Sequence, residues 1–378
     1  MRYRVSVNRD ARPRVDLGDF SPPDRVPLEF HRRLPGYART PLTPAPFLAE
    51  RAGVAEVLVK DESSRLGLPS FKILGASWAV VHAVREQWGT DLTGCRDVED
   101  MRERLLPLGP RALAAATDGN HGRGVARMAS LFGWRAHIFV PEGTAAARID
   151  AILSEGAQVT VVDGTYDDTV ERSAAEAGER TLVISDTSWP GYESTPRAVI
   201  EGYSTLFHEV ADELAETGQR QPDAVVVQAG VGALAAAAVR HFRGGFLDVP
   251  PRVIIVEPET AGCLLASAEA GRIAEVPGPH PSIMAGLNCG RPSPLAWPLV
   301  VQGADLFLSV EDEAAREGMR VLAKDSIVAG ETGAAGAAAL LAAGPEALGF
   351  TPGSRVLILN TEGATDPDAY RRTVGAAA

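Results

Sequence analysis

The chain has 378 residues, of which 45% are apolar and 23% charged, a composition that excludes wholesale disorder and a disulfide-stapled fold. Its 37 Lys and Arg against 49 Asp and Glu give a formal net charge of −12, so nucleic acid is not an expected partner. The first residues lack an apolar signal segment, and the apolar runs are shorter than a membrane span. We therefore expect a cytoplasmic protein that does not bind membranes.

The three cysteines Cys95, Cys263 and Cys289 are too few and too scattered for a structural zinc cluster. Each is expected to be a small buried apolar residue. A bridge between Cys263 and Cys289 stays open, because sequence alone cannot place their Cα atoms within disulfide distance. No metal site is expected.

Short apolar runs alternate with longer Ala-rich helical patterns along the chain. The expected strands are Val57–Lys60, Ala112–Ala116, Ala136–Val140, Gln158–Val162, Leu182–Ser185, Ala224–Gln228, Val253–Val256 and Val356–Leu359. The expected helices include Phe71–Glu86, Arg123–Phe132, Ala145–Ser154, Tyr166–Arg180 and Ala314–Leu322. Strand and helix in alternation predict an α/β fold with mainly parallel sheets, and the strands are too many for one small sheet.

The segment KDESSRLGLPSFKILGAS places a lysine at the start of an apolar helix. Ser70 is a candidate N-cap, and Lys72 lies in the first turn. Burial and the positive helix end would both lower the pKa of Lys72 and favour a nucleophilic amine. A lysine whose ammonium reaches solvent at a helix edge explains the pattern equally well. Only Lys60, Lys72 and Lys324 could perform chemistry that needs a lysine amine.

The segment ATDGNHGRGVA follows the expected strand Ala112–Ala116. Its glycines permit close backbone approach at a strand-to-helix turn, so Asn120 and His121 could face a ligand, with Asp118 adding a carboxylate. The alternative is a tight turn with a capping Asn. No second His or Cys lies at ligand spacing from His121, so metal binding is not expected there.

Two further segments place ligand-binding groups after apolar strands. In VVVQAGVGALAAAAVRHF, a Gly-x-Gly turn before a helix offers free N–H groups to an anion. It lacks both the nucleotide P-loop pattern and the third glycine of a dinucleotide site, so a small phosphorylated ligand fits better. In RVLILNTEGATDPDAY, Thr361 places a hydroxyl at a strand's end, unless it only satisfies its own turn.

Together these motifs resemble the fold-type II, tryptophan synthase β-like enzymes that use pyridoxal 5′-phosphate. Within that group the chain is most similar to the diaminopropionate ammonia-lyase family. The matching stretches, from Lys60 to Arg371, also include SDTSWPGYESTP followed by EGY, SIMAGLNCG, VAGETGAAG and NTEGATDPDAYR. Most related enzymes carry Ser, Ala or Thr where TDGNHG has Asp118, which makes this form specific.

The resemblance implies two three-layer α/β/α domains: a large cofactor-binding domain from residues 1–85 and 205–378, and a small domain from 86–204. It also implies a homodimer. The cofactor roles that it implies are aldehyde binding by Lys72, a hydrogen bond to the 3′-oxygen from Asn120, phosphate binding by Gly230, Val231, Gly232, Ala233 and Leu234, and a contact of Thr361 with the pyridine nitrogen. A neutral hydroxyl at that nitrogen would leave it largely unprotonated and suit β-elimination.

The implied reaction converts 2,3-diaminopropionate to pyruvate and ammonia. Because this substrate carries a second ammonium, its site should contain carboxylates, and Asp118 and Asp186 are the candidates. Lys72 would remove the α-proton of the L isomer, and Asp118 that of the D isomer.

Departures from the family pattern at Glu201, at Pro190-Gly191 and in Arg197–Ile200, which is less apolar and aromatic than the family's segment, leave the substrate open. Glu201 stands where the family's QGY motif has Gln, and Pro190-Gly191 follows a Trp where an acidic residue is usual. A solvated helix position explains Glu201 as well. The alternatives are a serine or threonine dehydratase, a β-replacement enzyme on the same fold, or a catalytically silent protein that binds pyridoxal phosphate.

Overall fold

The computed structural model describes residues 1–245 and 247–375. By its internal contacts the chain divides into two units. The larger consists of Met1–Pro23, Arg39–Ser64 and Leu206–Ala378, and the smaller of Asp24–Ala38 and Arg65–Thr205. This grouping differs from the expected domains, because residues 24–38 and 65–85 have their contacts in the smaller unit.

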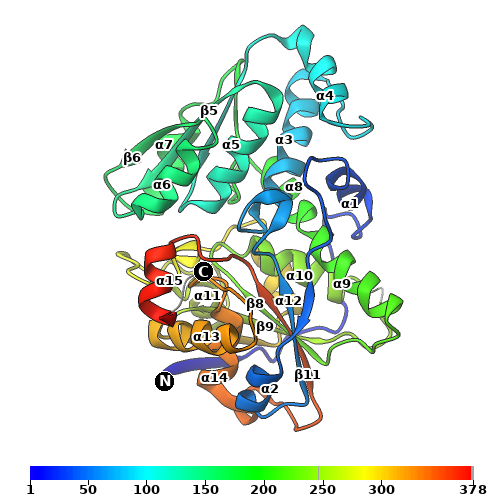
Figure 1. Ribbon diagram of the computed structural model, residues 1–378, viewed down its shortest axis with the longest axis vertical. Helices are drawn as coiled ribbons and strands as arrows, with labels where there is room; N and C mark the ends of the chain where they lie inside the picture. The colour runs from blue at the N-terminus through cyan, green and yellow to red at the C-terminus, as the bar shows by residue number, and fades with distance from the viewer. Residues whose placement is uncertain (246, 376–378) are drawn as a thin grey trace. The chain divides into compact units, whose positions relative to one another are not determined.

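A mixed seven-stranded sheet forms the centre of the larger unit (Figure 1). Its strands, in spatial order, are β1 (Tyr3–Val7), β10 (Leu306–Val310), β9 (Arg252–Pro258), β8 (Ala224–Gln228), β11 (Arg355–Asn360), β3 (Glu56–Asp61) and β2 (Leu42–Pro44). The edge strands β1 and β2 are antiparallel to their neighbours, and the other pairs are parallel. The carboxyl ends of β8 and β11 therefore lie at the same edge of the sheet, where ligands bind in open α/β folds.

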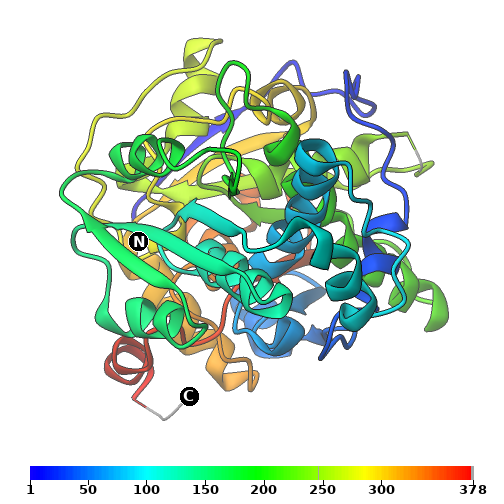
Figure 2. The same ribbon diagram turned by 90° about the horizontal axis from the view of Figure 1, so that it is seen from above.

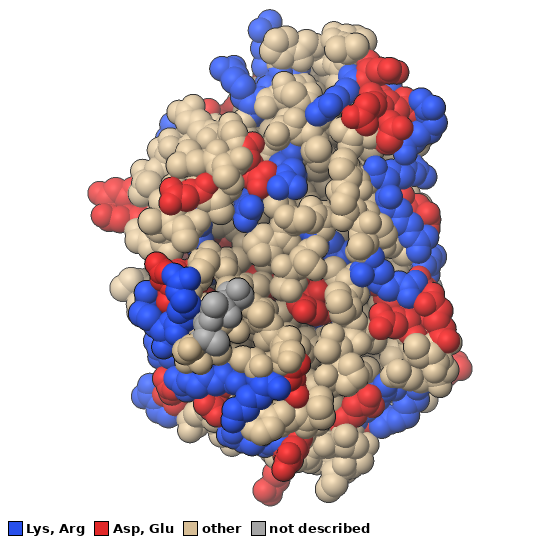
Figure 3. Space-filling view, viewed as in Figure 1, with Lys and Arg blue, Asp and Glu red and all other residues tan. Residues whose placement is uncertain are grey.

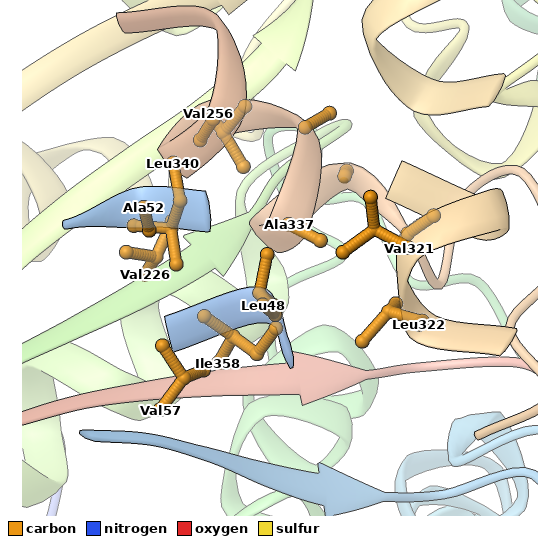
Figure 4. Close-up of a cluster of buried hydrophobic side chains, with 14 of the residues drawn as sticks. Leu48, Ala52, Val57, Val226, Val256, Val321, Leu322, Ala337, Leu340 and Ile358 are labelled. Atoms are coloured by element: carbon orange, nitrogen blue, oxygen red, sulfur yellow. The ribbon is translucent and has the colours of Figure 1, made fainter. Parts of the chain in front are cut away.

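Helices cover both faces of this sheet. The helices of the larger unit are α2 (Pro46–Ala52), α10 (Ala233–Arg243), α11 (Cys263–Ala270), α12 (Trp297–Gly303), α13 (Asp312–Lys324), α14 (Ala335–Leu348) and α15 (Pro367–Val374), together with most of α9 (Ser204–Glu216). Alternate strand residues such as Val226 and Ile358 join α2, α13 and α14 in one apolar cluster (Figure 4). The side chains between them point to the opposite face, where the Ala-rich α10 lies against β8 and β9.

The smaller unit contains a parallel four-stranded sheet, drawn in green at the upper left of Figure 1. Its order is β6 (Gln158–Val162), β5 (Arg135–Pro141), β4 (Ala112–Ala116) and β7 (Thr181–Val183). The helices are α1 (Val26–His31), α3 (Lys72–Trp88), α4 (Val98–Leu105), α5 (Asn120–Phe132), α6 (Ala146–Leu153), α7 (Tyr166–Ala174) and α8 (Ser194–Gly202). Because connections between parallel strands are right-handed, α5 and α6 lie on one face and the returning α7 on the other, which gives three layers.

Three glycines let the helices of the smaller unit approach closely around α3. A Cβ on Gly75 would lie 2.5 Å from the Tyr203 ring, and one on Gly202 would lie 2.5 Å from the Leu74 carbonyl oxygen. A Cβ on Gly124, in α5, would lie 3.2 Å from Ala76 Cβ. Helix α3 therefore packs against α5 and α8, which explains why residues 65–85 belong to the smaller unit.

The α/β fold class is confirmed, and each expected strand corresponds to an observed one. Strands β1, β2 and β10 were not expected. The first two are short edge strands with exposed side chains, which produce little apolar pattern. Helix α7 ends at Ala174 rather than at the expected Arg180.

Charges of both signs are interspersed on the face in Figure 3. Basic side chains of α13 and α15 pair with acidic ones nearby, as Arg320 does with Glu313 and Arg371 with Asp368. No helix within the described residues is long and apolar enough to cross a bilayer. In the same part of the chain, no group of three or more His, Cys, Asp or Glu could hold a metal ion, and the three buried cysteines form no disulfide.

Candidate active site

Lys72 opens α3 in the smaller unit. The expected cap from Ser70 is not formed: Phe71 is the N-cap residue without a side-chain cap bond, and the Ser70 hydroxyl only accepts a long 3.4 Å bond from Lys72 N. The Lys72 side chain is 17% exposed, and its amine lies 5.8 Å from the centre of the Phe71 ring. The apolar helix start therefore covers most of this side chain, which favours the first of the two interpretations that the sequence left open.

The Lys72 amine forms a buried ion pair with Asp186. Lys72 Nζ lies 2.7 Å from Asp186 Oδ2, and the hydroxyl of Tyr166, the first residue of α7, donates to Asp186 Oδ1 at 2.8 Å (positions of α3 and α7 in Figure 2). Burial opposes the charged forms, but the pairing outweighs it, raising the pKa of Lys72 and lowering the pKa of Asp186. The prediction of a lowered pKa for Lys72 is therefore wrong for this structure, because the sequence did not show that Asp186 would be its partner.

Asp118 and Asn120 lie at the turn from β4 into α5, and both are half-buried. The Thr117 hydroxyl accepts from the N–H groups of Gly119 at 2.9 Å and Gly122 at 3.0 Å, which fixes the turn. Gly119 has φ +142°, a conformation that favours glycine. Burial lowers the pKa of Lys72, whereas Asp186, Tyr203 and then the Asp118 carboxylate raise it. The smaller unit therefore brings Lys72 near both predicted carboxylates.

A hydrogen bond from His121 connects the turn that carries Asp118 to the segment that carries Asp186. His121 Nε2 lies 2.8 Å from the Ile184 carbonyl oxygen, two residues before Asp186. Because a carbonyl only accepts, Nε2 carries the hydrogen, and the buried Nδ1 has no hydrogen-bond partner. Burial lowers the pKa of His121, so the ring is neutral and acts as a link rather than as a metal ligand.

Tyr203 is a fully buried phenol beside this cluster. Its ring lies 4.7 Å from that of Phe71, and burial raises its pKa, so the hydroxyl stays protonated. The EGY stretch pointed to this tyrosine as a motif member only. Neither Tyr166 nor His121 had a predicted role at Asp186, since their contacts depend on the packing of α7 and β7.

The departures from the family pattern at Glu201 and at Pro190-Gly191 have structural explanations. Glu201 accepts a 3.5 Å hydrogen bond from the indole of Trp78 on α3. Pro190 and Gly191 form an exposed turn, closed by the stacked rings of Trp189 and Tyr192 at 4.1 Å. The Tyr192 hydroxyl accepts from Ser185 N, next to Asp186, so this turn supports the carboxylate's position.

A surface pocket of about 410 Å³ also lies in the smaller unit, between the second half of α3 and the segment around Tyr192. Glu86, Thr181 and Glu193 are among its lining residues, and none of the predicted site residues lines it. It is therefore separate from the Lys72 cluster.

The glycine loop between β8 and α10 lies in the larger unit. Gly232 has φ +97°, and α10 begins at Ala233 without a side-chain cap, so the first N–H groups of the helix have no acceptor within the helix itself. A Cβ on Gly230 would lie 2.9 Å from Cys289 Sγ, so the packing around this loop leaves no room for a side chain at position 230. An open start on an 11-residue helix is the geometry that the predicted anion-binding turn requires.

Thr361 follows the last residue of β11 and is 2% exposed. Its hydroxyl oxygen accepts from Gln228 Nε2 at 2.9 Å, so its own hydrogen remains available to a further acceptor. The sequence predicted the hydroxyl but not Gln228, the last residue of β8.

These residues fit pyridoxal 5′-phosphate. The smaller unit supplies a buried lysine amine, and the larger unit supplies an anion-binding turn and a neutral hydroxyl donor. The other buried lysine of the described residues, Lys60, lies within β3 rather than at a helix start, and it pairs with Glu209 at 2.7 Å. The fit rests on the donor groups and on the narrow glycine loop.

Comparison with known proteins agrees with the site. The family model described as pyridoxal-phosphate dependent enzyme matches residues 33–362. Diaminopropionate ammonia-lyase of Escherichia coli K12 is 38% identical over 365 residues, covering 93% of this chain and 90% of the relative. The Salmonella typhimurium enzyme of that name is 35% identical over 371 residues, covering 92% and 90%.

A solved structure of the Escherichia coli diaminopropionate ammonia-lyase, in complex with D-serine, superposes with a TM-score of 0.90 at 36% identity, covering 99% of this chain and 97% of that one. The same enzyme in complex with an aminoacrylate-PLP azomethine reaction intermediate gives a TM-score of 0.89 at 35% identity, covering 99% and 97%. The chain therefore belongs to the pyridoxal-phosphate dependent enzymes, and within them to the diaminopropionate ammonia-lyase family of lyases.

Proposed function

We propose that this chain eliminates ammonia from 2,3-diaminopropionate and releases pyruvate and a second ammonia. The observation that carries the proposal is the buried cluster of one lysine amine and two carboxylates in the smaller unit. A substrate with two ammonium groups requires negative charge in its site, whereas the hydroxyl leaving group of serine does not. Pyridoxal 5′-phosphate, when bound, supplies the electron sink for loss of the α-proton.

Lys72 performs two tasks in this proposal. Its amine binds the cofactor aldehyde, and once released it takes the α-proton of the L isomer. The nearby Asp118 carboxylate takes the α-proton of the D isomer from the opposite side. Two bases on two elements, α3 and the β4–α5 turn, would give one site access to both stereoisomers.

Asp186 holds the second ammonium of the substrate. Its pKa is lowered by pairing with Lys72 and by the hydrogen bond from Tyr166, although burial acts in the opposite direction. The group is therefore a carboxylate at neutral pH. It remains one when a substrate ammonium replaces the lysine ammonium beside it.

The remaining residues hold the cofactor. The turn Gly230, Val231, Gly232, Ala233 and Leu234 binds the phosphate through backbone N–H groups. Asn120 binds the 3′-oxygen, and Thr361 donates to the pyridine nitrogen. Each role follows the family resemblance and is compatible with the burial and hydrogen bonding found here.

The test is pyruvate release from protein loaded with pyridoxal phosphate. D- and L-2,3-diaminopropionate, D- and L-serine and L-threonine are supplied in parallel, with 2-oxobutyrate assayed for threonine. We expect the highest kcat/KM for diaminopropionate. A preference for serine or threonine would instead make the chain a dehydratase and would remove the assigned roles of Asp118 and Asp186.

Two finer features belong to the same proposal. The family resemblance implies a homodimer, which sedimentation equilibrium of the loaded protein would test. The sequence pattern led us to expect a cytoplasmic protein, which cell fractionation would test. The expected domains, residues 1–85 with 205–378 and residues 86–204, remain a proposal about folding units.

A further inference from the structure

We propose that Gln228 is a positioning residue that fixes the direction of the Thr361 hydroxyl hydrogen and thereby sets the protonation of the cofactor's ring nitrogen. The inference rests on the role of Thr361 in the proposed function. It assigns to the side chain at the end of β8 a task that no sequence motif indicates.

The orientation of the Gln228 amide is fixed by three oxygen atoms. Nε2 lies 2.9 Å from Thr361 Oγ1, 2.9 Å from the Leu359 carbonyl oxygen and 3.0 Å from the Thr332 carbonyl oxygen. Carbonyl oxygens only accept hydrogen bonds, so a flipped amide would place its own oxygen against them. The NH2 group must therefore face Thr361, and the side chain is 2% exposed.

This orientation decides what the Thr361 hydroxyl can do. Nε2 donates to the hydroxyl oxygen and cannot accept from it, so the hydroxyl hydrogen must point elsewhere. Within residues 1–245 and 247–375, no other protein group is hydrogen-bonded to this hydroxyl. The hydroxyl is therefore held as a donor that needs an acceptor.

A pyridine nitrogen accepts such a hydrogen only when it is unprotonated. If the nitrogen were protonated, it could only donate to the hydroxyl oxygen, and the buried hydroxyl hydrogen would have no acceptor. Losing one such hydrogen bond disfavours the protonated form by roughly tenfold. Gln228 thus keeps electron withdrawal into the ring weak, which suits rapid loss of a leaving group.

The other end of the amide supports a functional reason for this residue. Gln228 Oε1 is buried and has no hydrogen-bond partner. A buried orphan acceptor is unfavourable, and an apolar side chain of similar shape would avoid it. The NH2 end supplies what such an apolar side chain would lack, namely a donor fixed toward Thr361.

The test uses holoenzyme loaded with pyridoxal phosphate labelled with ¹⁵N in the ring, without substrate. The ¹⁵N chemical shift reports the protonation of the ring nitrogen across a pH series. We expect Gln228→Met, which keeps length but cannot donate, to raise the protonated fraction roughly tenfold. We expect the same direction for Gln228→Glu, whose oxygen would draw the hydroxyl hydrogen toward itself. This second variant serves if the first does not fold.

Dependence on Thr361 separates positioning from a general packing effect. In a Thr361→Val background, Gln228→Met should change the ¹⁵N shift no further. Asn8→Asp is the matched control, because Asn8 Nδ2 also donates to two backbone carbonyls, at 2.7 Å each, but Asn8 follows β1 and is not a site residue.

An unchanged shift in both Gln228 variants, or an equal change in the Thr361→Val background, would overturn the proposal. Because the shift is read without substrate, it stays informative if diaminopropionate is not turned over. In that case the proposed function fails and the role of Gln228 stands.

Discussion

Replacing Asp186 by Asn tests the buried ion pair of the smaller unit. The amide keeps the shape of the side chain and an oxygen that can accept from Tyr166, but it leaves the Lys72 ammonium without its counter-charge. Breaking a buried pair costs about 3–5 kcal/mol. Since 17% of the Lys72 side chain remains exposed, we expect about 2–4 kcal/mol. Thermal melting of cofactor-free protein should show a Tm lowered by roughly 3–5 °C.

The pH dependence of this loss has a defined sign. The Asp186 pKa is lowered on folding, so its stabilisation is present above about pH 4 and lost as the pH falls through the folded pKa. The Lys72 pKa is raised, so its stabilisation is present below about pH 10 and lost as the pH rises through the folded pKa. In the variant, burial dominates and lowers the pKa of Lys72. The variant therefore regains stability toward high pH, and the difference from wild type should shrink between about pH 8 and 10.

Two controls isolate the pair. Asp163→Asn, at an exposed position of the same unit, should change the free energy of unfolding by no more than about 0.5 kcal/mol. In a Lys72→Met background, Asp186→Asn should lose most of its effect. A full effect without Lys72, or a difference from wild type that does not vary with pH, would refute the reasoning.

Three further substitutions test other parts of the site. Asp118→Asn should lower kcat/KM for D-diaminopropionate by about 10²–10⁴-fold and that for the L isomer far less, measured as pyruvate release. Gly75→Ala places a methyl 2.5 Å from the Tyr203 ring and should lower the free energy of unfolding in urea by about 1–3 kcal/mol. Gly230→Ala places a methyl 2.9 Å from Cys289 Sγ and should weaken cofactor binding roughly tenfold, with partial recovery when Cys289→Ala is added.

Each of these expectations has a contrary outcome. An equal loss for both isomers rejects the assignment of Asp118 as the second base. Gly94→Ala is the control for helix packing, because a Cβ there would meet no atom within 4 Å. Equal destabilisation at Gly75 and Gly94 would reject the close-packing argument. A Gly230→Ala protein that binds pyridoxal phosphate normally, as judged by fluorescence titration, would reject the narrow phosphate turn.

Much of the fold could be predicted because buried parallel strands leave continuous apolar runs. Ala112–Ala116 and Ala224–Gln228 were predicted with the bounds that the structure shows. Edge strands lack this signal: β1, YRVSV, has an exposed or half-buried residue at every position and pairs with only one neighbour. The grouping of α3 with the smaller unit depends on glycine contacts with α5 and α8, which no local pattern specifies.

In the site, too, local sequence patterns identify individual residues but not the distant residues that they contact. Motifs identified Lys72, Asp118 and Thr361 because their positions relative to strands are local features. The partners of Lys72 and Thr361 are not local: Asp186 is 114 residues from Lys72, and Gln228 is 133 residues from Thr361. The pKa of Lys72 was predicted in the wrong direction for this reason, since the sequence shows the burial but not the counter-charge.

The ion pair itself bears on the choice of substrate. The Lys72 ammonium lies 2.7 Å from Asp186 Oδ2. In the proposed function, the second ammonium of the substrate would lie at this same place. When that amine is engaged by the cofactor aldehyde, Asp186 loses its partner while remaining buried, and an uncompensated buried charge is unfavourable. Diaminopropionate restores a positive charge there, whereas serine brings only a hydroxyl. Under the proposed function, this charge balance at Asp186 favours a substrate with a second ammonium over serine.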